Sequence, residues 1–309
     1  MWLGRIRSAC IHIDSEKLGR DLSLERKPVY PPAMRLPVRS LVFVAVSAAL
    51  VTTSATAEKT PALAGLLRHA NEDFGRSAES ASIFQNTFIK MAGDIASILG
   101  PRKLGPSTTS GSLGFDLGVD IALSTVDEGS AHWANALPGD DGLMNTVALQ
   151  FRKGLPFGFE LGGDVAHLAD SDLWALGLNL KYTFLEGYSY LPEAALRVGF
   201  WGVAGSRELD LVIISTDLAV SKEFGLGGVV AIAPYFTYGL LVAMASTNVV
   251  GYFPAGEALP VNGVVPTQTI TVNRGGLGFR LLFPYSALSV EAVFSPGVQT
   301  YTTSVSLVL

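Results

Sequence analysis

Cysteine is almost missing from this sequence. Among 309 residues the single cysteine is Cys10, and it lies in a segment that we expect to be removed during export. A mature chain without a thiol excludes disulfide bonds and thiolate chemistry. It is compatible with an exported protein.

Charged residues are also scarce. They make up 16% of the chain, against roughly 25% in ordinary soluble domains. Hydrophobic residues make up 49%, which excludes a disordered protein. Something other than lysine and glutamate must therefore cover the outside of the fold.

A surplus of positive charge is missing as well. Residues 1–57 hold eight of the 22 basic and four of the 27 acidic residues, so the remainder has 14 basic and 23 acidic residues and a net charge of −9. Binding to nucleic acid needs a basic surface. The charge balance argues against a nucleic-acid partner.

No hydrophobic run reaches the roughly 18 residues of a transmembrane helix. The nearest is 41–51, which follows Arg35 and Arg39 and leads to Ala55-Thr56-Ala57, a pattern that signal peptidase cleaves. We therefore interpret residues 1–57 as an upstream extension plus a cleaved signal peptide whose hydrophobic core is 41–51. An uncleaved signal anchor is the alternative.

Residues 58–110 form a second segment, with a helix predicted over 61–99. Apolar residues recur there at spacings of three and four, which is the pattern of one helix face; they are Phe84, Phe88, Met91, Ile95, Ile98 and Leu99. Gly100-Pro101 ends the pattern, and a linker rich in Pro, Gly, Ser and Thr follows. We expect a periplasmic helix that packs on the lower rim of the following domain. A plug or a partner-docking helix is the alternative.

From residue 113 onward the hydrophobic period changes to two, which indicates β-strands. Ten segments have this pattern: 113–123, 143–153, 157–167, 172–184, 193–204, 209–222, 229–243, 268–283, 287–295 and 300–309. Many are close to the 9 to 11 residues with which a tilted strand crosses a bilayer. Residues 111–309 are thus predicted to be an all-β, transmembrane, antiparallel up-and-down barrel of about ten strands, with eight to twelve left open.

The residues opposite the apolar face decide between a membrane barrel and a soluble one. They are mostly Gly, Ala, Ser and Thr with few charges, which suits a crowded interior better than a surface in water. On the apolar face, aromatic residues gather near the strand ends, as in the girdles of membrane barrels. If the first strand rises from the periplasm, the turns at 153–156, 185–192, 223–228 and 284–286 lie at the lower, periplasmic end, and the other connections lie at the upper, external end. The aromatic residues near the lower turns are Phe151, Phe157, Phe159, Tyr182, Phe184, Phe279 and Phe283, and those near the upper ends are Trp174, Phe294 and Tyr301.

Nine charged residues are predicted to face the lumen. They are Asp116, Asp120, Arg152, Glu160, Asp164, Lys181, Arg197, Arg280 and Glu291. Opposite charges at similar depth are expected to pair, because an unpaired buried charge is costly. The simplest interpretation is a packed polar core; the functional alternative is an ion-selective constriction.

The connections offer three weaker candidates. The long loop 244–267 is apolar and could contact a ligand through Tyr252 and Phe253. His167 beside Asp170-Ser171-Asp172 invites comparison with the omptin proteases, but without a second base the chemistry is incomplete. Acidic residues of the first upper loop lack an ordered calcium-ligand spacing. No catalytic, cofactor-binding or metal-binding residue is predicted.

The chain ends in a strand with strict alternation, Tyr301 to Leu309. Together with the signal peptide, the helix, the linker and the first strand Leu113-Gly-Phe-Asp-Leu-Gly118, it resembles the uncharacterised outer-membrane β-barrel proteins of Gram-negative bacteria. The resemblance implies an outer-membrane location, with lipid and the barrel assembly machinery as partners, the latter through the C-terminal strand.

Three functions remain open at this point. The leading hypothesis is a non-enzymatic, porin-like barrel that passes or binds a small or hydrophobic solute. The second is a structural or adhesion barrel with a plugged lumen. The third is an omptin-like surface protease. Fold alone does not decide among them.

Overall fold

The computed structural model describes residues 60–74, 78–102, 105–127, 130–136, 142–187, 191–227, 229–248 and 266–309. The predicted signal peptide, Cys10 and the proposed ligand contacts Tyr252 and Phe253 lie outside these residues. The predictions made for them are therefore untested.

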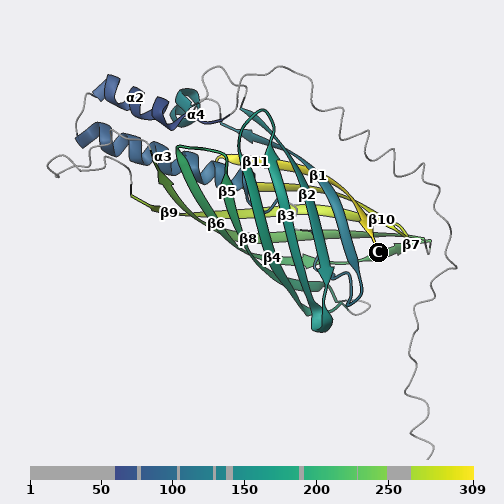
Figure 1. Ribbon diagram of the computed structural model, residues 1–309. Coiled ribbons are helices and arrows are strands. Elements are labelled where there is room, and N and C mark those ends of the chain that lie inside the picture. The colour runs from purple at the N-terminus through teal and green to yellow at the C-terminus, as the bar shows by residue number, and fades with distance from the viewer. Residues whose placement is uncertain are drawn as a thin grey trace, which may run out of the picture. The chain divides into compact units, whose positions relative to one another are not determined.

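Ten long antiparallel strands close into one barrel, as the sequence predicts (Figure 1). The strands are β1 (Phe115–Val126), β2 (Leu143–Gly154), β3 (Phe159–Leu168), β4 (Trp174–Leu185), β5 (Glu193–Ala204), β6 (Leu209–Ser221), β8 (Val230–Thr247), β9 (Gln268–Leu282), β10 (Ser286–Ser295) and β11 (Val298–Val308). The short strand β7 (Phe224–Leu226) pairs only with β8 and extends a hairpin at the rim. A 3-10 turn, η1 (Pro156–Gly158), joins β2 to β3.

The first and last strands close the ring. β1 pairs with β11 from Asp116 opposite Val308 to Val126 opposite Val298. On the other side of the barrel β6 pairs directly with β8, so β7 does not interrupt the ring. Closure leaves no backbone edge exposed on the barrel wall, which a lipid environment requires.

Alternation along the strands turns large apolar side chains outward, and in the lower half of the barrel it turns polar ones inward. On β11, Tyr301 and Leu307 are exposed, whereas Thr302 and Ser304 are buried. Nine of the ten predicted aromatic belt residues are among the exposed apolar side chains of the described chain, Phe159 being half-buried. The outside of the barrel is therefore an apolar surface with aromatic side chains near both rims.

Two helices precede the barrel and a short one lies in its first long connection. They are α2 (Leu63–Phe74), α3 (Ala78–Leu99) and α4 (Ala131–Ala136). The helix predicted over 61–99 thus contains two helices. None of the described helices is both long and apolar enough to cross a bilayer.

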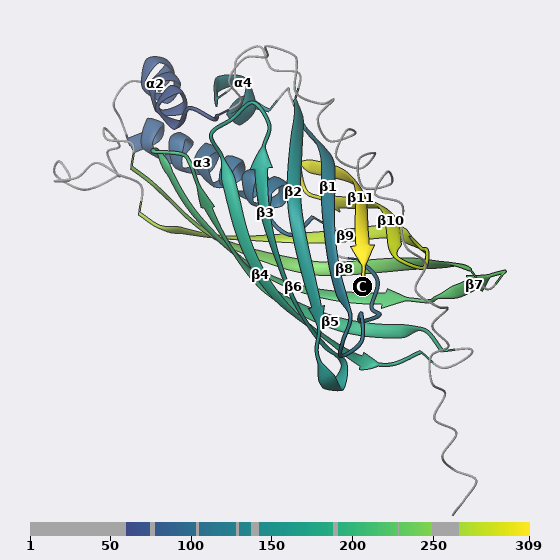
Figure 2. The same cartoon turned by 45° about the vertical axis from the view of Figure 1, so that its right-hand side comes forward.

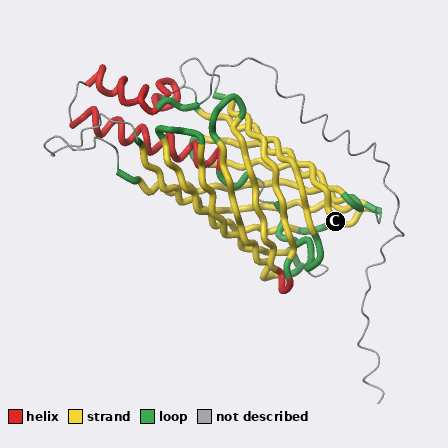
Figure 3. The backbone as a smooth tube through the Cα atoms, viewed as in Figure 1, coloured by secondary structure: helices red, strands yellow, loops and turns green. Residues whose placement is uncertain are grey.

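The predicted place of this helical segment on the lower rim is wrong. α3 enters the barrel mouth at the opposite end, where α4 lies and the longest connections emerge (Figures 1 and 2). Figure 3 shows the helix running into the mouth formed by the strands. The physical reason is that the lumen near this end is lined by apolar side chains, which can bury the apolar stripe of α3.

Candidate functional site

The upper half of the lumen is an apolar seat for α3. The six residues of the predicted helix stripe are at most 2% exposed. They belong to one hydrophobic cluster with wall residues that include Met144, Leu168, Leu209, Leu211, Ile213, Leu241, Ile270, Val272 and Val298. Burial of this much apolar surface stabilises the helix inside the mouth.

Gly93 of α3 faces the wall at β9. A Cβ atom added at Gly93 would lie 3.4 Å from Cγ2 of Ile270 and 3.7 Å from Cγ2 of Val272. Both distances lie in the range of ordinary van der Waals contact, so an alanine would fit at this position. Glycine is therefore not required here for the packing of α3 on β9.

Polar contacts tie the helices to three upper connections of the barrel. Asp94 on α3 accepts a hydrogen bond from Nε1 of Trp133 at 2.8 Å, and its Oδ2 atom lies 2.9 Å from Nε2 of His132, both on α4. The backbone N–H of Ala64 donates to Oε2 of Glu208 at 3.1 Å.

The third contact is at the turn after β3. The backbone N–H of Asp172 donates to Oγ1 of Thr60 at 3.0 Å. The segment that contains α2 and α3 is thus held at the loop end of the barrel from several sides.

Below α3 the chain continues through the lumen as an extended linker. The Pro101 carbonyl accepts a hydrogen bond from Nη1 of Arg274 at 2.6 Å, and the Gly105 N–H donates to Oε2 of Glu291 at 3.2 Å. Gly105 has a φ of +67°, and a Cβ atom there would lie 2.8 Å from Nη1 of Arg152. Only glycine fits this conformation and this contact without strain.

Further down, the linker bonds to the lower ends of the strands. The Ser107 N–H donates to Oγ of Ser221 at 2.9 Å, and the Ser107 carbonyl accepts from Oγ1 of Thr183 at 2.6 Å. The Ser110 N–H donates to Oε2 of Glu160 at 3.2 Å. The described linker residues 101–102 and 105–110 therefore lie in the lumen between α3 and β1.

Four ion pairs lie in the lumen, three between wall residues and one between the linker and the wall. Their N···O distances are 2.6 Å for Arg274 and Asp217, 2.6 Å for Arg280 and Asp116, 2.9 Å for Lys181 and Glu160, and 3.5 Å for Arg102 and Asp164. Pairing lowers the cost of holding charges away from bulk water.

The charges deep in the lower lumen, away from the rim, balance. In the described part of the chain the cations are Arg102, Arg152, Lys181, Arg197, Arg274 and Arg280, and the anions are Asp116, Asp120, Glu160, Asp164, Asp217 and Glu291. To this inner set the barrel wall supplies five cations and six anions; the sixth cation, Arg102, comes from the linker. The linker thus completes the balance of the inner set, while at the lower rim the inward-facing Glu193 accepts a hydrogen bond from Oγ of Ser221.

All nine charged residues singled out in the sequence lie inside the barrel, eight of them buried and Asp164 partly so. Three further charged residues inside the barrel were not predicted from the sequence: Arg102, Asp217 and Arg274. Asp217 was hard to assign because β6 carries apolar residues on both faces near its upper end. Its position in the alternation of β6 was a usable signal, since Asp217 shares a strand face with Ser215, Ala219 and Ser221.

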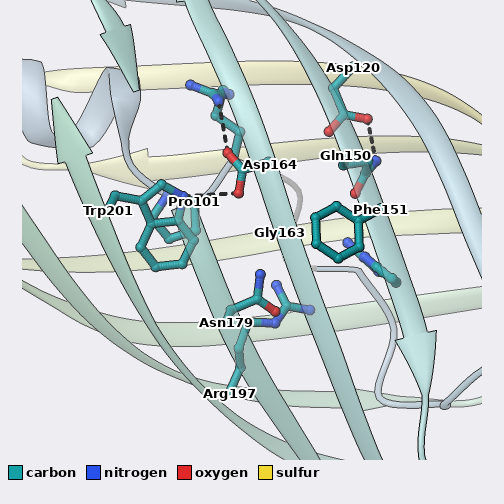
Figure 4. Close-up of a pocket in the computed structure, with 11 residues that line it drawn as sticks. Pro101, Asp120, Gln150, Phe151, Gly163, Asp164, Asn179, Arg197 and Trp201 are labelled. Atoms are coloured by element: carbon teal, nitrogen blue, oxygen red, sulfur yellow. Dashed lines mark hydrogen bonds and ion pairs between the residues drawn. The ribbon is translucent and has the colours of Figure 1, made fainter. Parts of the chain in front are cut away.

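A small cavity of about 20 Å³ lies between the linker and the wall (Figure 4). Trp201 borders it and donates from Nε1 to Oδ1 of Asp164 at 3.0 Å, while Gln150 donates to Asp120. The Trp201 ring fills the space above Gly177 and Gly199, where an added Cβ would overlap it. The cavity has room for about one water molecule, so it is too small for an organic solute.

The enzyme-like cluster at the turn after β3 is a backbone cap. Oγ of Ser171 donates to the Leu168 carbonyl at 2.9 Å and accepts from the Leu173 N–H at 3.1 Å. The His167 ring stacks on Trp174 with a centroid distance of 4.3 Å. These contacts are those of a turn, in which a side-chain oxygen caps nearby backbone groups.

Metal ligands do not gather in the described chain. No group of three or more His, Cys, Asp or Glu side chains is arranged there to hold an ion. Of the acidic residues in the first upper loop, only Asp127 is described.

Comparison with solved structures finds β-barrels of Gram-negative bacteria. The attachment invasion locus protein Ail of Yersinia pestis is 12% identical, with a TM-score of 0.25, and the match covers 64% of this chain and 99% of Ail. The β domain of the Bordetella autotransporter BrkA is 10% identical, with a TM-score of 0.38 and coverage of 63% and 99%. The KdgM porin is 11% identical, with a TM-score of 0.27 and coverage of 62% and 98%.

No family model matches the chain, and no curated protein matches it either. The three solved structures belong to the class of proteins that the sequence resembles. At these identities and TM-scores, no ligand, activity or residue role is transferred from them.

Proposed function

We propose that this chain is a non-enzymatic β-barrel of the outer membrane that its own residues 78–114 close. In this proposal it serves as a surface scaffold, in the structural or adhesion class, and does not act as a pore. This is the plugged-barrel alternative of the sequence analysis. Solute binding by Tyr252 and Phe253 stays a separate prediction.

The outer surface supports the membrane location. Large apolar side chains are exposed all around the barrel, Leu176 at 63% and Phe200 at 53% among them. Such a surface is unstable in water and matches the lipid-facing belt of an outer-membrane barrel. The balanced charges lie inside, where they are shielded from lipid.

The single observation that carries the proposal is the filled lumen. The helix α3 seals its upper half with apolar contacts, and the linker hydrogen-bonds to wall residues through its lower half. A solute could pass only if this segment left the lumen. Removing it would cost buried apolar area and leave wall charges with fewer partners.

Planar-bilayer recording of the complete mature protein tests the proposal. We expect no steady channel current from the wild type, because α3 and the described part of the linker occupy the lumen. As a positive control, Phe88→Asp places a charge in the apolar seat of α3 and should produce open-channel currents. Lys90→Asp, on the exposed face of the same helix, is the matched control and should remain closed.

The wild-type recording decides the outcome by itself. Large, steady currents from the wild type would contradict the proposal and restore the porin-like hypothesis. Resistance of the folded barrel to SDS at room temperature verifies that each variant has assembled before it is recorded.

A further inference from the structure

We infer that residues 60–114 thread the barrel, so that α2 and α3 lie at the cell surface although the strand that follows them begins at the periplasmic rim. This inference goes beyond the proposed closure of the lumen. It rests on the proposed outer-membrane location. It concerns the path of the chain across the membrane.

The first step is that the two ends of the barrel segment share one rim. Phe115 and Leu309 exchange two backbone hydrogen bonds, each 2.8 Å long. Short connections join the strands at this same rim, among them 155–158 and 283–285. We call it the lower rim.

The second step is that α2 and α3 lie at the opposite rim. The contacts of Asp94 with α4, of Ala64 with Glu208 and of Thr60 with Asp172 reach three different connections, and all three connections emerge from the upper end. Figure 2 shows α2 and α4 together beyond the strand ends, far from the C-terminus.

The third step is that the linker joins these two rims through the inside. Its hydrogen bonds descend the wall in chain order, from Arg274 in the middle of β9 to Ser221 at the end of β6. The Gly154 N–H at the end of β2 donates to the Gly114 carbonyl at 3.1 Å. The partners on the wall are buried side chains, so the linker runs through the lumen and not along the outside.

The fourth step sets the direction. In outer-membrane barrels the turns on the periplasmic side are short and the external loops are longer. The two longest connections here, 127–142 and 248–267, are both at the upper end with the helices. The upper end is therefore the external one, and the chain before β1 crosses the membrane inside the barrel.

The consequence is a surface composed of α2, α3 and the upper connections. α2 presents charged side chains to solvent there, with Arg68 and Glu72 exposed to 78% and 65%. A segment in this place is open to antibodies, proteases and labels added outside the cell, whereas a periplasmic helix would be protected.

Single-cysteine labelling in intact cells tests the inference. In a Cys10→Ser background we would introduce Arg68→Cys on α2, Asp172→Cys in the turn after β3, or Glu223→Cys at the lower rim. All three side chains are exposed, so each change should leave the fold intact. A membrane-impermeant maleimide is then added before and after lysis, and SDS resistance checks assembly.

We expect Arg68→Cys and Asp172→Cys to react fully in intact cells and Glu223→Cys to react at least tenfold less until lysis. Protection of Arg68→Cys alongside labelling of Asp172→Cys would overturn threading. Labelling of Glu223→Cys in intact cells would overturn the orientation. The bilayer currents are measured independently: a wild type that stays closed while Arg68→Cys is protected would overturn threading alone, whereas a conducting wild type would contradict the proposed closure.

Discussion

At the level of single residues, Arg274 links the wall to the segment inside it. Its Nη2 atom donates to both carboxylate oxygens of Asp217, at 2.6 and 2.7 Å, and its Nε atom donates to Oδ1 at 3.0 Å. Its Nη1 atom donates a hydrogen bond to the Pro101 carbonyl. A planar guanidinium can satisfy such a set of acceptors at fixed angles, which a lysine cannot do.

The glycine across the strand pair explains how Asp217 fits. Gly239 is the register partner of Asp217 on β8, and a Cβ atom there would overlap the carboxylate. The lack of a side chain at this position lets the aspartate lie flat against the wall and face Arg274 across β8. This is a packing requirement that a charge pattern alone does not reveal.

The prediction at the level of residues concerns the ion pair of Arg274 and Asp217. Arg274→Ala should lower the free energy of unfolding by about 3–5 kcal/mol, because it leaves the Asp217 carboxylate buried without its cation. Asp217→Ala should cost a similar amount. The double variant should cost less than the sum of both, since no charge is then left alone. Urea unfolding in lipid vesicles, followed by tryptophan fluorescence, measures all three.

Arg68→Ala is the matched control for this experiment. Arg68 forms an exposed ion pair with Glu72 at 3.9 Å, and exposed pairs contribute less than about 1 kcal/mol. If Arg274→Ala were no more destabilising than Arg68→Ala, the buried pair would not have the structural importance assigned to it.

At the level of elements, the strands were predictable because alternation is a local property. The predicted strand 193–204 agrees with β5 at both ends, and the predicted 209–222 differs from β6 by one residue. The predicted strand 229–243 ends too early, because β8 continues to Thr247. The three-residue β7 was not predicted, because so short a strand has no periodicity to detect.

The inward face was harder to predict than the strands themselves. On β6 the run Leu211-Val212-Ile213-Ile214 is apolar on both faces, one toward lipid and one toward α3. The rule that the interior is polar holds in the lower lumen and fails in the upper lumen. A strand that is apolar on both faces is thus a signal that something apolar occupies the barrel at that height.

At the level of elements, the closing seam between β1 and β11 can be tested by cross-linking. Ser124 on β1 is opposite Thr300 on β11, and their hydroxyl oxygens are 2.8 Å apart inside the barrel. Directly opposed residues have Cα atoms about 4.5–5.5 Å apart, within the range of a disulfide. Ser124→Cys with Thr300→Cys, in a Cys10→Ser background, should therefore form a disulfide across the seam.

Mass spectrometry of the digested, unreduced protein detects the cross-linked peptides. Ser124→Cys with Thr302→Cys is the register control, because Thr302 is opposite Ala122 and the diagonal separation is about 7–8 Å. Equal cross-linking of both pairs would contradict the register of the closing strands.

At the level of the whole molecule, the place of α3 could not be derived from its own sequence. Its stripe from Phe84 to Leu99 was recognised, but the surface that buries it is assembled from at least six strands that are distant along the chain. That surface exists only after the ring has closed. The inward direction of the nine lumen charges was predictable, because it follows from the place of each residue in the alternation of its own strand. Which charge pairs with which could not be predicted, because the pairing depends on the closed ring.

The last prediction follows from the charge balance of the closed barrel. In the inner lumen the wall supplies one more anion than cations, and Arg102 of the linker offsets it at Asp164, 3.5 Å away. Arg102→Gln removes this cation from a buried place and should cost about 2 kcal/mol of stability. It should also loosen the linker, so that brief channel openings appear in planar bilayers.

These openings should favour cations, because the emptied lumen then has a net negative charge, and charged side chains set the selectivity of a pore. The reversal potential in a potassium chloride gradient measures the preference. Arg102→Lys keeps the charge at this place and should stay closed for most of the recording. Anion-selective openings of Arg102→Gln, or equal opening of both variants, would show that charge balance by the linker does not hold this barrel shut.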